Sequence, residues 1–108
     1  MTTFDEREKA YEKKFAHDAD LKFKAESRRN KYIAEWAASK LGITGPALED
    51  YIKAVRKADL ASKGDDDVFE KIKGDLSAKG VAVADIEIRK QMNEFLAKAV
   101  SEVEASRG

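Results

Sequence analysis

Apolar residues recur at helical spacing in four stretches of the chain, and glycine or proline separates the first two of these stretches. Repeats of three, four and seven residues place such side chains on one face of a helix. The four apolar sets are, in chain order, Tyr32, Ile33, Trp36, Ala37 and Leu41; Leu48, Tyr51, Ile52, Val55 and Ala58; Val68, Phe69, Ile72 and Leu76; and Ile88, Met92, Phe95, Leu96, Ala99 and Val103. Four amphipathic helices with short connections predict an all-α fold, a four-helix bundle.

Helix-terminating residues fit the same division. Gly42 suits the position just after a helix, and Pro46 suits the first turn of the next one. Three consecutive aspartates at 65–67 supply N-cap oxygens for a third helix. We expect helices over about 3–40, 47–62, 65–79 and from about 85 onward.

The first 24 residues are amphipathic but poor in apolar surface. Phe4, Tyr11 and Phe15 lie within roughly 40° of one another on a helical projection. Twelve of these 24 residues are charged, six acidic and six basic, so charges interrupt the apolar arc. Three aromatics on that arc cannot offset the entropy lost on ordering so long a segment. Residues 1–24 therefore predict a partly projecting helix that docks on another protein, with 25–108 as the bundle. A solvated surface helix is the alternative.

Composition narrows the class of protein. The 108 residues suit one domain, and 21 basic residues balance 21 acidic ones. Nucleic-acid binding usually needs a basic surplus, so no nucleic-acid partner is expected. The chain has no cysteine and no apolar run long enough for a signal core or a membrane span. These features predict a soluble, cytoplasmic protein that is not inserted in a membrane.

Catalytic and metal-binding patterns are missing. The only histidine, His17, stands beside Asp18 on the charged segment, where contact with a partner is favoured over metal ligation. A calcium loop beginning at the first aspartate of 65–67 would need glycine at its sixth position, which is Glu70. No nucleophile–base pair can be named, so we expect no enzyme activity, no cofactor and no metal.

A basic cluster, Arg28, Arg29 and Lys31, lies where the charged segment meets the apolar face. It could bind phosphate or an acidic surface, but a solvated rim of the bundle is favoured. The neighbouring pair Tyr32 and Trp36 is expected in the core.

Several motifs resemble one family. They are TFDERE, KFAHDADLKFKAESRRN, EWAASKLG, GDDDVFEKIKGDL and GVAVADIEIRKQMNEFL, and they cover nearly the whole chain. The chain is similar to the zeta subunit family, the small ATPase inhibitors of the F-type ATP synthase in alphaproteobacteria.

The resemblance implies a four-helix protein that stops the rotary motor from hydrolysing ATP. It implies that the N-terminal segment enters the interface between a catalytic and a non-catalytic subunit of the F1 head, near the central rotor. In this chain that element corresponds to residues 1–18, with 19–23 as its base. The expected location is the cytoplasm, peripheral at the inner face of the membrane through the ATP synthase.

Pattern and resemblance together predict aromatic anchors and a set of polar contacts on the first helix. The predicted partner-binding residues are Phe4, Asp5, Arg7, Glu8, Tyr11, Lys14, Phe15, His17, Asp18 and Lys22. The main alternative is a helical adaptor that docks the same helix on another partner. A membrane-surface helix is disfavoured because six acidic groups accompany only three aromatics.

Overall fold

The computed structural model describes residues 19–60 and 66–107; residues 1–18, 61–65 and 108 lie outside the described part. Four helices occupy the described residues: α2 (Ala19–Leu41), α3 (Pro46–Leu60), α4 (Asp66–Ala78) and α5 (Asp85–Arg107). No strand occurs among them. The predicted all-α helical bundle is confirmed over this part of the chain. The expected start of the first helix, at 3–18, lies outside it.

Two predicted helix ends are confirmed by backbone geometry. Gly42 and Gly80 have φ values of 75° and 76°, which favour glycine because it has no Cβ. After Gly42, the Ile43 N–H donates to the Ala38 carbonyl at 2.9 Å. After Gly80, the Val81 N–H donates to the Leu76 carbonyl at 2.9 Å. Both reach back across the final turn, as in a Schellman motif, and satisfy carbonyls that the helix leaves unpaired.

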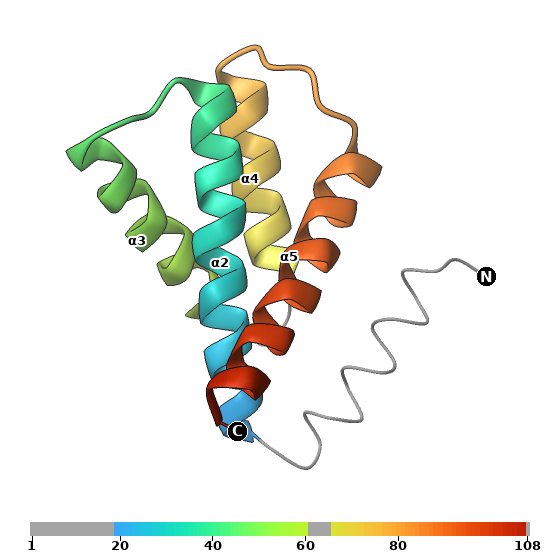
Figure 1. The fold of residues 1–108 in the computed structure, drawn as a ribbon. Helices are drawn as coiled ribbons and strands as arrows, with labels where there is room; N and C mark the ends of the chain where they lie inside the picture. The colour runs from blue at the N-terminus through green and yellow to red at the C-terminus, as the bar shows by residue number, and fades with distance from the viewer. Residues whose placement is uncertain (1–18, 61–65, 108) are drawn as a thin grey trace.

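α2 is the central element of the bundle. It contacts α3, α4 and α5, whereas α3 and α5 make no contact with each other. Figure 1 shows α2 between α3 and α5, with α4 behind it. The N-terminal end of α2 lies beside the C-terminal end of α5 (Figure 1). Residues 1–18 therefore connect to the bundle at the end where α2 begins and α5 finishes.

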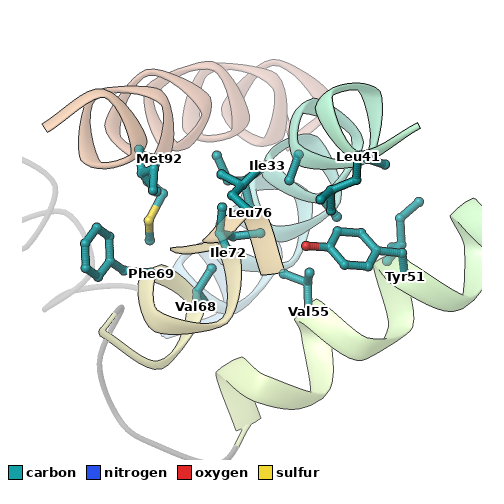
Figure 2. Close-up of a cluster of buried hydrophobic side chains, with 14 residues drawn as sticks. Ile33, Leu41, Tyr51, Val55, Val68, Phe69, Ile72, Leu76 and Met92 are labelled. Atoms are coloured by element: carbon teal, nitrogen blue, oxygen red, sulfur yellow. The ribbon is translucent and has the colours of Figure 1, made fainter. Parts of the chain in front are cut away.

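The larger of two buried apolar clusters joins all four helices (Figure 2). Every apolar residue predicted for α4 is buried in it. The cluster consists of Ile33, Ala34, Ala37, Ala38, Leu41, Tyr51, Ile52, Val55, Val68, Phe69, Ile72, Leu76, Ile88 and Met92. Burying so many large side chains removes enough apolar surface from water to account for the association of the helices.

A smaller cluster lies between the first half of α2 and the second half of α5. It consists of Ala25, Leu96, Ala99 and Val100, with Tyr32 packed against it. The expectation that Tyr32 and Trp36 are core residues needs correction, because both are only half-buried. Tyr32 turns its hydroxyl to Glu102, and Lys40 lies 5.0 Å from the centre of the Trp36 ring. Both rings pack partly against the clusters, while the Tyr32 hydroxyl reaches Glu102 and the Lys40 ammonium lies over the face of the Trp36 ring.

Candidate partner-binding site

One of the ten predicted partner-binding residues lies in the described part of the chain. Lys22 is exposed on the first turns of α2. The other nine precede Ala19 and lie outside the described residues: Phe4, Asp5, Arg7, Glu8, Tyr11, Lys14, Phe15, His17 and Asp18. The site is therefore described here at its base, where α2 begins.

A polar network joins the middle of α2 to the end of α3. The Arg29 Nε donates to Asn30 Oδ1 at 2.8 Å, and the Asn30 amide donates to Asp59 Oδ2 at 2.9 Å. The Arg29 guanidinium also lies 3.6 Å from Asp59 Oδ1. The side chains of Arg29 and Asn30 are almost wholly buried, at 1% and 2% exposure. We name Arg29, Asn30 and Asp59 the polar network.

The burial of Arg29 corrects the interpretation of the basic cluster as a solvated rim. Arg28 and Lys31 are exposed as expected, but Arg29 points inward. Its partner, Asp59, lies in the last turn of α3, where the helix dipole disfavours an acidic group. Arg29 compensates that charge. Sequence spacing gave no signal of this pair because its members are thirty positions apart on different helices.

A groove lies above the polar network, between α2 and α3. It encloses about 480 Å³, and its lining includes Lys22, Phe23, Asn30, Arg56, Asp59 and Leu60. Phe23 and Leu60 remain 67% and 78% exposed, whereas most large apolar side chains of the described helices are packed into the clusters. Asn30 and Asp59 of the polar network thus form part of the lining, together with two exposed apolar side chains. We name this the α2–α3 groove.

On the other side of α2, charged groups surround Tyr32. Its hydroxyl donates to Glu102, and Arg28 lies 3.6 Å from the same carboxylate. Lys98 lies 4.5 Å from the centre of the Tyr32 ring. The hydrogen bond to Glu102, followed by burial, raises the pKa of Tyr32 above its ordinary value. The hydrogen bond and the ion pair tie the middle of α2 to the end of α5.

No group of three or more acidic, histidine or cysteine side chains that could hold a metal ion occurs within the described residues. None of the described helices is both long and apolar enough to cross a membrane.

The chain matches the family model for ATPase inhibitor subunit zeta over residues 1–102. It belongs to that family. A comparison with curated proteins gave no match. The match confirms the resemblance seen in the motifs, and it includes the segment before α2 as well as the bundle. Membership in the zeta family supports an ATPase-inhibitor role, and it implies a regulatory subunit that binds the ATP synthase.

Proposed function

We propose that this zeta-family protein inhibits ATP hydrolysis by inserting residues 1–18 into a subunit interface of the F1 head. The interface is formed by a catalytic and a non-catalytic subunit, close to the central rotor. Phe4, Tyr11 and Phe15 fill apolar pockets there. Arg7, Glu8, Lys14 and Asp18, among the other polar residues predicted above, set the register of the helix.

The observation that carries this proposal is that the family match includes residues 1–18, whose aromatics share one helical arc. Apolar side chains spaced by one and two turns are the usual anchors of a helix that docks in a groove. Such aromatics also dominate the binding energy of many protein interfaces. The four described helices meanwhile supply two apolar clusters of their own, which suits them to act as an anchor and a bulky stop.

Inhibition follows from unequal affinity for the rotational states of the enzyme. A ligand shifts an equilibrium only by the difference in its affinity for the two states. A helix wedged in an interface that must close during hydrolysis binds the open state better. Closure then requires expulsion of the helix, and the rotor stops in the state that binds it.

The test is the full-length chain with Phe4, Tyr11 and Phe15 all changed to serine, mixed with purified F1 head. Loss of three anchors is expected to raise the half-inhibitory concentration about 100-fold or more. A chain without residues 1–18 should not inhibit at all. Thermal melting of each variant checks that the bundle stays folded. Full inhibition by the shortened chain would refute the proposed role of this segment.

The alternative is a helical adaptor that docks the same segment on another partner. The purified F1 head again separates the two functions, because an adaptor would leave its rate of ATP hydrolysis unchanged. Binding without inhibition would favour the adaptor, and dose-dependent inhibition would favour the inhibitor.

A further inference from the structure

The α2–α3 groove has exposed apolar side chains on both of its helices. Phe23, from α2, and Leu60, at the end of α3, are two of the three exposed large hydrophobic residues in the described part of the chain. Phe23 also borders a second hollow of about 330 Å³ on the α5 side of α2. It therefore stands as an exposed ridge between two hollows. Clustered exposed apolar groups with a polar surround are typical of protein-interaction surfaces.

The charges around this groove favour one kind of partner. Of its four charged lining residues, Lys22 and Arg56 are exposed, whereas Glu26 and Asp59 are half-buried. The Asp59 carboxylate already accepts from Asn30 at 2.9 Å and faces the Arg29 guanidinium at 3.6 Å. The two fully exposed charges of the lining, on Lys22 and Arg56, are thus positive, while the lining as a whole carries two charges of each sign. Complementary charge steers association and fixes register.

We infer that the α2–α3 groove is a second docking site for the ATP synthase. The groove accepts an apolar side chain of the enzyme that has carboxylates on either side of it. This inference rests on the proposed function, and it extends the interface beyond residues 1–18. Phe23 is the anchor on the inhibitor, since aromatic side chains are enriched in interface cores. Lys22 and Arg56 pair with the acidic groups of the partner.

Continuity with the proposed interface supports this occupant. Lys22 is both a predicted partner-binding residue and part of the groove lining. It lies three residues after the start of α2, so a partner that holds residues 1–18 is brought next to the groove. Two linked contacts raise the affinity because the second one forms within an existing complex.

The polar network gives the groove a fixed shape. Asn30 and Asp59 both line it together with Phe23 and Leu60, and their hydrogen bond joins α2 to α3. A site whose lining is already held in place loses less entropy on binding. The groove is expected to bind without rearrangement of the two helices.

Cross-linking identifies the occupant directly, because the chain has no cysteine of its own. A full-length Leu60→Cys variant carrying a photoreactive group is mixed with F1 head and irradiated. The expected product joins this position to a subunit of the enzyme. Ile86→Cys is the matched control, since Ile86 is 69% exposed but lies at the start of α5. It should give no such product. A cross-link to residues 1–18 of the same chain, or to a second copy, would overturn the inference.

Inhibition assays give a second readout. The double variant Phe23→Ser/Leu60→Ser is expected to raise the half-inhibitory concentration about tenfold while full inhibition is still reached at saturation. Ile86→Ser should change nothing. An unchanged half-inhibitory concentration in the double variant would overturn the inference, and so would a lower one, which would indicate that the groove holds residues 1–18 in the free protein.

The two proposals fail in different ways. If residues 1–18 are not the inhibitory segment, the triple serine variant described above still inhibits ATP hydrolysis, whether or not the groove binds the enzyme. If only the groove assignment is wrong, that triple variant loses inhibition while the Phe23→Ser/Leu60→Ser variant behaves like the natural chain.

Discussion

The two halves of α2 are held in the bundle by different forces. The half that ends at Leu41 contributes five residues, beginning with Ile33, to a cluster of fourteen buried apolar side chains from all four helices. The half that starts at Ala19 adds only Ala25 to a cluster of four, and the polar network ties it to α3. Apolar packing is strong but has little directional preference, whereas hydrogen bonds and ion pairs fix an orientation.

This difference separates stability from positioning. The large apolar cluster at the second half of α2 can supply most of the free energy of folding. The first half buries fewer apolar side chains, chiefly Leu21 and Ala25. Its orientation therefore also depends on the Arg29–Asp59 pair and on the Tyr32–Glu102 hydrogen bond. The first half also bears Phe23 and leads from residues 1–18. The end of the bundle that is proposed to bind the enzyme is thus the end whose orientation depends on polar contacts.

The largest expected effect is a truncation in the large cluster. Ile72 is wholly buried, and Ile72→Ala is expected to cost about 4 kcal/mol of the free energy of unfolding because it leaves a cavity. Leu96→Ala, in the small cluster, should cost about 2–3 kcal/mol because fewer large neighbours surround it. Urea unfolding of both variants gives the comparison. Equal losses would show that the two clusters act as one core.

The next largest expected effect is the loss of stability when Arg29 of the polar network is removed, compared with removal of its neighbour Arg28. Arg28 and Arg29 each lie 3.6 Å from a carboxylate, but the Arg28 side chain is 44% exposed and that of Arg29 is 1% exposed. Arg29→Ala is expected to cost about 2–3 kcal/mol, since it removes a buried partner of Asp59 and leaves a cavity. Arg28→Ala should cost about 0–1 kcal/mol, as exposed pairs do.

Inhibition assays on the same pair sharpen the result. Arg29→Ala should also weaken inhibition at a temperature where the variant is still folded, because the first half of α2 loses its fixed orientation. Arg28→Ala should not. If thermal melting shows similar stability for the two variants, burial of Arg29 has no energetic consequence and the network does not fix α2.

Apolar periodicity predicted the four described helices and most of their buried positions, but Tyr32 and Trp36 of α2 and Leu48 and Ala58 of α3 are only half-buried. All four predicted residues of α4 are buried, and the α5 set matches except that Phe95 is half-buried and Val100 was not included. Glycine and proline gave the helix ends near Gly42, Pro46 and Gly80. Periodicity works here because most buried side chains of each helix lie on one face, although the most extensive pair, α2 and α5, is distant in sequence.

The groove and the polar network could not be predicted in the same way. The pattern identified Arg29 as one of three basic residues, and only the fold brings Asp59 to it. Phe23 and Leu60 carry no signal in the sequence, because an exposed apolar residue is common on any protein surface. Their proposed role in binding depends on the fact that both line the same groove, Phe23 from α2 and Leu60 from α3. That proximity is a tertiary fact, and no local spacing encodes it.

The smallest expected effects come from two tyrosine hydroxyls, one at each half of the bundle. The Tyr51 hydroxyl, in the large cluster, donates to Asp75 at 2.8 Å. Burial first, and the hydrogen bond to Asp75 second, raise the pKa of Tyr51 well above its ordinary value of 10.0. In the unfolded chain the phenol ionises near pH 10, while in the fold it stays protonated. The stabilisation from this group is therefore complete below pH 10 and is lost as the pH rises above it.

Tyr51→Phe is expected to cost about 1 kcal/mol at neutral pH, because the Asp75 carboxylate loses a buried donor. The same variant should lose less stability than the natural chain between pH 10 and 11. Tyr32→Phe removes a half-buried hydroxyl beside Glu102 and should cost about 0.5 kcal/mol, with a weaker effect at alkaline pH. Chemical unfolding at pH 7, 10 and 11 measures both variants. A larger loss for Tyr32 than for Tyr51 would reverse the comparison, since it would place the stronger hydrogen bond at the half of α2 that holds the groove.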